Sequence, residues 1–240
     1  MAEVEHRPWP LPSGGWTWRQ SWHDLLFAHW PVRAAELRAL VPPELTVQER
    51  EGTAWIGVVP FRMSGVMRRP FPDLPWVSAF PELNVRVYVE HDGRPGVWFL
   101  SLDAANALAV WAARRFFYLP YYRARMTLAE HGDTIHYTSK RAGAEFRSTY
   151  RPTSAVYQTR PGSLDHWLTE RYCLYARSPD GGIRRNDVHH APWPLQSAEA
   201  SFERNTLLDF HGVRVDPKQT PLLHFARRLD VVVWGGERVT

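Results

Sequence analysis

One short segment of the chain carries the side chains best suited to chemistry. In FPELNVRVYVEH, residues 80–91, polar and apolar residues alternate, so Glu82, Asn84 and Arg86 would project from the same face of a strand. In the wall of a pocket, Glu82 could act as an acid or base and Arg86 could hold an anion. On a solvated face, Glu82 and Arg86 would instead form cross-strand ion pairs. The residues alone leave both interpretations open.

A second group of polar side chains follows in a turn rich in aromatic residues. These candidates are Arg114, Arg115, Tyr118, Tyr121 and Tyr122. The tyrosine hydroxyls could donate hydrogen bonds to a carbonyl or carboxylate, or the rings could simply pack in a core. No lysine occurs anywhere between Phe80 and Met126, so this part of the chain offers no amine nucleophile.

The chain shows no motif for a metal or for a phosphate-bearing cofactor. His189 and His190 are adjacent in an expected strand, so their side chains would face opposite ways, and no HExxH or paired CxxC accompanies them. The single Cys173 cannot form an internal disulfide and is expected to be a buried thiol. We therefore expect neither a cofactor nor a metal.

Charge and hydropathy narrow the class of protein. The net charge is +4, and all but two of the 29 basic residues are arginine, the exceptions being Lys140 and Lys218. Arginine suits anionic ligands, although a GC-rich genome would produce the same bias. The basic residues form no long stripe, and no apolar run resembles a membrane span or the core of a signal peptide. These features predict a cytoplasmic protein that binds neither nucleic acid nor membranes.

The elements that must position these groups are mostly strands. We expect strands over residues 21–30, 53–63, 83–90, 97–102, 123–130, 135–141, 145–150, 172–177, 183–189, 198–202 and 229–234. Pro60 would place the second of them at an edge or beside a bulge. Helices are expected over 32–40, over 104–115 with Asp103 as its N-cap, and after Ser163.

The order of these elements favours one fold class. Strands and helices do not alternate regularly, which argues against a doubly wound parallel sheet and favours an α+β protein with mainly antiparallel strands. We expect a single domain over residues 16–240, preceded by a flexible lead-in at residues 1–15. The proline-rich segment 64–81 would form a loop or lid.

Several blocks of the sequence resemble a known family. They are SWHDLLFAHWPV, LRALVPPEL, AWIGVVPFRM, FPELNVRVYV, GVWFLSLDA, LPYYRARM and ERYCLY. On these blocks the chain resembles, over roughly Trp18 to Trp234, the YqjF-like family of uncharacterised bacterial proteins, a distant branch of the acetoacetate decarboxylase-like superfamily. The resemblance implies a mainly antiparallel β-barrel or cone around an apolar cavity, with two or three flanking helices.

The same resemblance assigns places to the candidate residues. Residues 80–82 look like the decarboxylase segment that supplies a pocket carboxylate, which puts Glu82 in the pocket wall. Residues 113–115 and 119–122 are similar to the Gly-Arg-Glu and aromatic-Pro-Lys-Lys segments of the enzyme. Both segments contribute to the pocket in that superfamily.

The departures from the decarboxylase pattern affect its chemistry directly. The two lysine positions are occupied by Tyr121 and Tyr122, and the glutamate position by Arg115. The pocket arginine of the enzyme would fall near Trp30. Because a phenol cannot form an iminium, decarboxylation through a Schiff base is not expected.

The sequence therefore predicts a pocket for one unidentified small molecule, partly apolar and anionic, without Schiff-base chemistry. An alternative is an enzyme that acts on a keto acid or enol by acid–base catalysis at Glu82, aided by tyrosine and arginine donors. A third hypothesis is an interaction protein that uses segments 64–81 and 191–195, where exposed aromatic residues would indicate a contact of a homo-oligomer.

Overall fold

The computed structural model describes residues 3–71, 79–216 and 218–240, and in these residues the strands join into one sheet. The strands are β1 (Trp18–Val32), β2 (Thr46–Val47), β3 (Ala54–Arg68), β4 (Phe80–His91), β5 (Arg94–Ala104), β6 (Tyr121–Arg123), β7 (Arg125–His131), β8 (Thr134–Arg141), β9 (Ala144–Pro152), β10 (Cys173–Arg177), β11 (Ile183–His190), β12 (Gln196–Asn205), β13 (Leu222–Val233) and β14 (Glu237–Arg238). The helices are α1 (Ala34–Arg38), α2 (Ala107–Phe117), α3 (Leu164–Thr169) and α4 (Leu207–Phe210). Among the described residues, no helix is long and apolar enough to cross a membrane.

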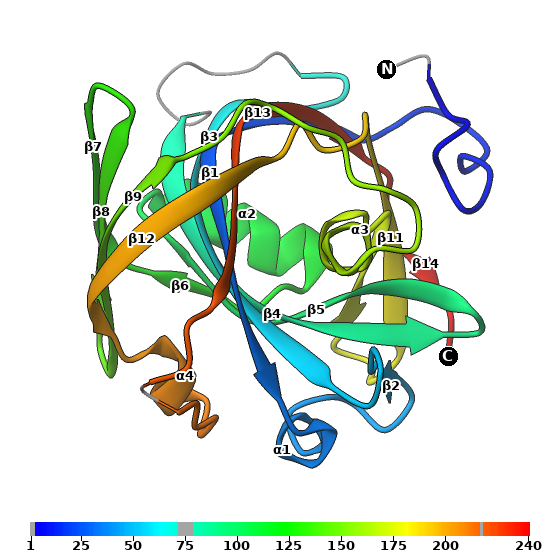
Figure 1. Ribbon diagram of the computed structural model, residues 1–240. Helices are drawn as coiled ribbons and strands as arrows, with labels where there is room; N and C mark the ends of the chain where they lie inside the picture. The colour runs from blue at the N-terminus through cyan, green and yellow to red at the C-terminus, as the bar shows by residue number, and fades with distance from the viewer. Residues whose placement is uncertain (1–2, 72–78, 217) are drawn as a thin grey trace.

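The pairing of the strands brings distant parts of the chain together. Hydrogen-bonded neighbours follow the order β14–β11–β10–β5–β4–β3–β1–β13–β12–β9–β8–β7. Because β11 also pairs with β13, the seven strands from β11 to β13 along this order form a closed circuit of pairings. Neighbours are antiparallel except in the pairs β10–β5 and β5–β6. In Figure 1 the circuit bends around the middle of the molecule, while β7, β8, β9 and β12 lie on the left.

The sheet is buried on both of its faces along β1 and β4. In β1, Leu26 and Ala28 belong to one apolar cluster, whereas Leu25 and Phe27 belong to another. Successive side chains of a strand point to opposite faces, so the uninterrupted apolar run LLFA fills two cores at once. The cavity described below lies in the second of these two clusters.

Pro60 was expected at the edge of the sheet or beside a bulge, and it lies beside a bulge. His23 pairs with Arg62 and Ala28 pairs with Val58, so β1 has one more residue than β3 between these pairs. Asp24 takes up the extra residue with a φ of 52°. The strand that contains Pro60 is nevertheless an interior one, because it pairs with both β1 and β4.

Two expectations for helix caps had different outcomes. The cap at Ser163 is confirmed, since its Oγ accepts a hydrogen bond of 3.2 Å from the backbone N–H of His166 at the start of α3. The cap at Asp103 is wrong, because β5 continues through Ala104 and α2 begins at Ala107. The Asp103 carboxylate instead binds side chains of β8, as discussed below.

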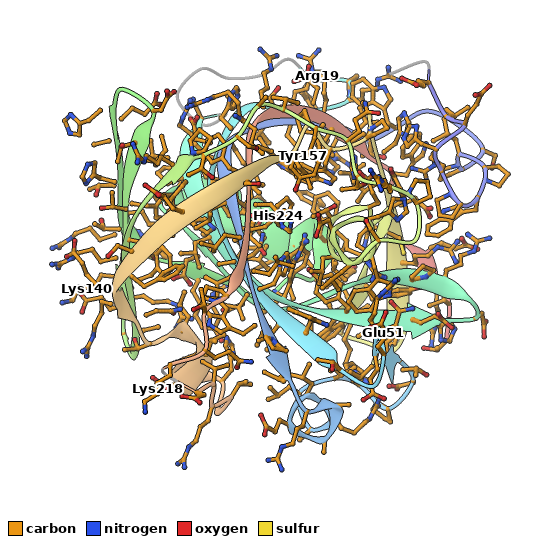
Figure 2. The ribbon with its side chains drawn as sticks, in the orientation of Figure 1. Arg19, Glu51, Lys140, Tyr157, Lys218 and His224 are labelled. Carbon is orange, nitrogen blue, oxygen red and sulfur yellow. The ribbon has the colours of Figure 1, made fainter. Side chains whose placement is uncertain are left out.

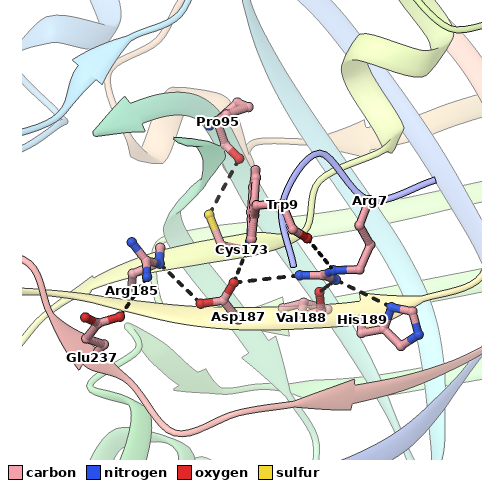
Figure 3. Close-up of polar contacts among 9 residues, drawn as sticks. All are labelled: Arg7, Trp9, Pro95, Cys173, Arg185, Asp187, Val188, His189 and Glu237. Carbon is pink, nitrogen blue, oxygen red and sulfur yellow. Dashed lines mark hydrogen bonds and ion pairs between the residues drawn. The ribbon is translucent and has the colours of Figure 1, made fainter. Parts of the chain in front are cut away.

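The N-terminal residues, which we expected to be a flexible lead-in, make specific contacts with β11 (Figure 3). The indole Nε1 of Trp9 donates a hydrogen bond of 2.8 Å to Asp187, and the Arg7 guanidinium lies 3.7 Å from the same carboxylate. Arg7 also donates to the carbonyl of Val188 and is almost completely buried. This part of the chain is therefore packed against the outside of the strand circuit.

Candidate functional site

A cavity of about 150 Å³ lies within the strand circuit. Every strand of the circuit contributes to its lining, from Phe27 of β1 to Val233 of β13. Most of the wall is apolar, and its aromatic members are Trp18, Trp22, Phe27, Phe61, Phe80, Phe99, Phe117, Tyr121 and Trp193. A cavity of this size holds a small organic molecule of about one benzene ring when its lining is apolar.

One polar group in the wall is a buried carboxyl bound to a phenol. The hydroxyl of Tyr121 on β6 donates a hydrogen bond of 2.6 Å to Glu82 Oε2 on β4, and both residues are buried. Burial raises the pKa of Glu82 to about 8; the bond from Tyr121 counteracts part of this shift, and nearby Asp103 adds to it. Glu82 is therefore mostly protonated at neutral pH, so it can donate as well as accept a hydrogen bond.

Two arginines form the second polar group in the wall. Arg86 Nη2 donates to the carbonyl of Leu168 at 3.0 Å, and Arg171 Nε donates to the carbonyl of Trp167 at 2.7 Å. Both carbonyls belong to the end of α3, where helix carbonyls lack partners within the helix. The last turn of α3 thus holds both guanidinium groups beside the cavity.

Neither of these arginines has an acidic partner in the described part of the chain. The other hydrogen-bond partners of Arg86 and Arg171 are neutral: Arg86 donates to the Tyr88 hydroxyl at 3.2 Å, and Arg171 donates to the Gln48 side chain at 2.6 Å. Burial, in the first place, lowers the pKa of Arg171 to about 10, still well above neutrality. Two buried positive charges therefore border the cavity without a carboxylate in direct contact; Glu90, which binds the Gln48 amide, attracts Arg171 only at longer range.

Several polar atoms of the wall lack any hydrogen-bond partner among the described residues. The donors are Arg86 Nε, Arg171 Nη2, Trp22 Nε1 and Trp193 Nε1, and the acceptor is Asn84 Oδ1. Buried polar atoms are nearly always paired in native proteins, with protein, water or ligand. The wall is consequently rich in free donors and suits a ligand rich in acceptors.

Four of the residues singled out from the sequence border this cavity. They are Glu82, Asn84, Arg86 and Tyr121. The first three alternate along β4 with Leu83, Val85 and Val87, which pack in the other core. These three side chains therefore share one face of β4, as the alternation predicted.

The other candidates lie away from the cavity. Trp30 packs against Phe202 in the opposite core, with ring centroids 5.6 Å apart. Arg114 and Arg115 are exposed on α2, and Nε of Arg114 donates to the backbone carbonyl of Tyr121 at 2.7 Å.

The remaining two tyrosine candidates contact arginines outside the cavity wall. Tyr118 faces Arg184, whose guanidinium carbon is 5.8 Å from the ring centroid. The guanidinium of Arg141 lies over the Tyr122 ring at 4.2 Å. Neither tyrosine therefore points its ring toward the cavity that Tyr121 borders.

Sequence reasoning missed several residues of the wall. Arg171 precedes β10, and nothing in its local pattern distinguishes it from the many surface arginines. Trp193 lies in segment 191–195, where exposed aromatic residues would have supported an interaction surface; only 2% of Trp193 is exposed, and its ring packs against Phe27. The alternation of β1 could have identified Phe27, since it shares a face with Leu25.

Neither lysine of the chain lines this cavity, and Figure 2 shows both at the edge of the molecule. Lys140 is exposed on β8 and pairs with Glu145 at 3.4 Å, and Lys218 is exposed after the last helix. No lysine borders the cavity in the described residues. An amine that could form a Schiff base is thus missing from the wall.

Comparison with known proteins places the chain in a family. Residues 19–230 match the model of the DUF2071 family, described as “Uncharacterized conserved protein”. The chain belongs to this family. It is also similar to “Uncharacterized protein YqjF” of Bacillus subtilis (strain 168), with 48% identity over 227 residues that make up 93% of each protein. The resemblance to YqjF-like proteins is therefore confirmed.

Solved structures show the fold of this DUF2071 chain to be acetoacetate decarboxylase-like. The enduracididine biosynthesis enzyme MppR, in complex with the condensation product of pyruvate and imidazole 4-carboxaldehyde, is similar with a TM-score of 0.68 and 14% identity over 92% of this chain and 88% of that chain. Acetoacetate decarboxylase from Legionella pneumophila is similar with a TM-score of 0.65 and 14% identity over 98% and 93%. At this identity the likeness concerns the fold alone.

Proposed function

We propose that this protein binds a small, partly apolar anion in the cavity, with the sheet forming a cone around it. The single observation that carries the proposal is the pair of buried guanidinium groups, Arg86 and Arg171, neither of which forms a salt bridge with a carboxylate of the described residues. A buried charge without a counter-ion is costly, and a bound carboxylate would supply one. Arginine binds carboxylates through paired, charge-assisted hydrogen bonds.

The rest of the wall is consistent with an anion that has an apolar body. Aromatic rings and aliphatic side chains make up most of the lining, and further unpaired donors come from Trp22 and Trp193. MppR, which shares the fold, has been solved in complex with pyruvate, a small carboxylate. This likeness supports a small anion as the type of ligand, and the arginines of this chain supply the specific argument.

Calorimetric titration with benzoate and with the neutral isostere benzamide tests the proposal. We expect benzoate to bind, and Arg86→Gln and Arg171→Gln to weaken it by about tenfold or more each, because each removes a charge-assisted hydrogen bond. The matched control is Arg214→Gln, which changes an exposed arginine. Equal affinity for benzamide and benzoate, or full affinity in both cavity variants, would contradict anion binding.

A second candidate function is acid–base catalysis on a keto acid or enol without a lysine adduct. The pKa of Glu82, about 8, lies close to physiological pH, which suits a group that both gives and takes a proton. The Tyr121 hydroxyl would orient this carboxyl. Exchange of the methyl protons of pyruvate in D2O, followed by NMR, would then be faster with the protein and fall about a hundredfold or more in Glu82→Gln. If Glu82→Gln did not slow this exchange, acid–base catalysis by Glu82 would be excluded and binding would remain the proposed function.

The third hypothesis, interaction through aromatic segments, has less support. Most of the proline- and tryptophan-rich part of segment 64–81 lies outside the described residues, and Trp193 of the other segment is buried. Homo-oligomerisation and a cytoplasmic location stay predictions.

A further inference from the structure

The polar groups of the cavity are arranged in order along β4. Glu82, Asn84 and Arg86 are two residues apart, so their positions on the strand are spaced by about 6.7 Å. Opposite them on β3 lie Phe61, Val59 and Gly57, respectively. The row of polar groups in the cavity wall therefore has one end at Arg86 and the other at Glu82, with Asn84 between them.

The end at Arg86 is the cationic one. Arg171 lies at this end too, since its guanidinium carbon is 4.9 Å from the ring centroid of Tyr88, whose hydroxyl accepts from Arg86. The carbonyls at the end of α3 hold both side chains here. A carboxylate of the ligand belongs at this end.

Flat aromatic surfaces separate the two ends. Trp193 meets Phe27 edge to face at 4.8 Å and stacks with Trp22 at 5.7 Å. Trp22 in turn meets Phe61, the residue opposite Glu82, at 5.8 Å. Aromatic rings pack favourably both edge to face and offset, so this wall suits a planar ring.

The end at Glu82 carries no net charge at neutral pH. The carboxyl is mostly protonated, and it already accepts a hydrogen bond from Tyr121. Next to it, Asn84 is 5% exposed and its Oδ1 has no partner in the described residues. A neutral hydroxyl, which donates and accepts, satisfies these groups, whereas a second carboxylate would find no cation and would lie beside an ionisable acid.

We propose that the ligand is an aromatic monocarboxylic acid with a hydroxyl at the end of the ring opposite the carboxylate. Its carboxylate binds Arg86 and Arg171, its ring packs on Phe27 and Trp193, and its hydroxyl donates to Asn84 Oδ1. This inference rests on the proposed function, because it requires the cavity to take an anion. To the anion already proposed, it adds an aromatic ring and a hydroxyl at the opposite end of that ring.

Calorimetric titration with three related acids tests the inference. They are benzoate, 4-hydroxybenzoate and terephthalate. We expect the hydroxylated acid to bind about tenfold more tightly than the unsubstituted one, the usual value of one hydrogen bond to a buried, unpaired acceptor. The dicarboxylate should bind more weakly than either at pH 7. Equal affinities for the first two acids, or tightest binding of the dicarboxylate, would overturn the inference.

A variant then locates the hydroxyl. In Asn84→Leu, which keeps the size but removes the amide, the advantage of the hydroxylated acid should disappear, and in the control Arg214→Gln it should persist. An advantage that survives in a folded Asn84→Leu protein would contradict the assigned position. Failure of the underlying proposal looks different: none of the three acids would then bind, or their binding would be unaffected by Arg86→Gln.

Discussion

Two buried acidic groups lie almost side by side and have opposite surroundings. Glu82 pairs with Ala104 in the register of β4 and β5, and Asp103 occupies the neighbouring pair with Leu83. Asp103 accepts hydrogen bonds from Ser139 at 2.9 Å and from Arg141 at 2.6 Å. Glu82 instead accepts a hydrogen bond from the phenol of Tyr121 and has no cationic partner among the described residues. The two groups thus differ in whether a positive charge compensates a buried carboxyl.

The basic residues show the same contrast. Arg141 forms a buried ion pair with Asp103, and its guanidinium carbon lies 4.2 Å from the ring centroids of both Tyr122 and Phe210. Arg86 and Arg171 have only neutral partners among the described residues. The comparison shows that a compensated pair packs on one side of the sheet, while the groups without a direct counter-ion line the cavity on the other side, where we propose that a ligand binds.

The largest effect is expected from breaking the compensated pair. Arg141→Leu leaves Asp103 buried beside no cation and should lower the free energy of unfolding by about 3–5 kcal/mol. Arg171→Leu should stay within about 1 kcal/mol of the wild type, because relief of a buried unpaired charge offsets the lost hydrogen bonds. Urea unfolding monitored by tryptophan fluorescence measures both. Equal losses in the two variants would remove the distinction between the two groups of arginines.

The next effect concerns the pH dependence of stability. The pKa of Glu82 is 4.5 in the reference state and about 8 in the folded protein, so its neutral form is favoured by folding. The contribution of Glu82 is therefore fully present below pH 4.5 and is lost as the pH rises through about 8. Glu82→Gln, which cannot ionise, should be more stable than the wild type by a few kcal/mol at pH 9 and should lose this advantage near pH 5.

A companion variant gives this experiment its control. Burial raises the pKa of Asp103 too, despite its bonds to Arg141 and Ser139. Asp103→Asn should nevertheless destabilise the protein at neutral pH, because it leaves Arg141 without its counter-ion. Chemical unfolding between pH 5 and pH 9 follows both variants. A stability difference between Glu82→Gln and the wild type that does not change with pH would show that Glu82 stays in one protonation state.

The smallest effect is expected at the phenol. Tyr121→Phe removes one hydrogen bond, worth about 1 kcal/mol, and this bond favours the ionised form of Glu82. The pKa of Glu82 should therefore rise further, as read from the 13C chemical shift of its carboxyl carbon. Tyr122→Phe is the matched control, since this ring packs against Arg141. A titration of Glu82 that is the same in both variants would disprove the role of the Tyr121 hydroxyl.

The fold and one wall of the site could be predicted because they depend on local patterns. Period-two alternation identified β4 and placed Glu82, Asn84 and Arg86 on a common face. The same rule, applied to β1, would have rejected Trp30, which shares a face with Ala28 and not with Phe27. The error arose from following the resemblance to the decarboxylase and not the alternation.

The other walls could not be predicted because their residues are brought together only by the tertiary fold. Arg171 reaches the cavity through the parallel pairing of β10 with β5, a contact between segments far apart in sequence. Asp103 looked like a helix cap because its partner Arg141 is 38 residues away, on β8. Patterns within one segment carry no information about such partners.

The pairing of β11 with β13 has a consequence for how related proteins can diverge. A shift of one residue in the register of a strand would turn the cavity side chains of that strand into the opposite core. In a closed circuit, one strand cannot shift unless the others shift with it. New ligand preferences in this family should therefore arise by replacement of single side chains at alternate positions of β1, β3 and β4. The backbone of the circuit would then stay the same between relatives, and only the side chains that line the cavity would differ.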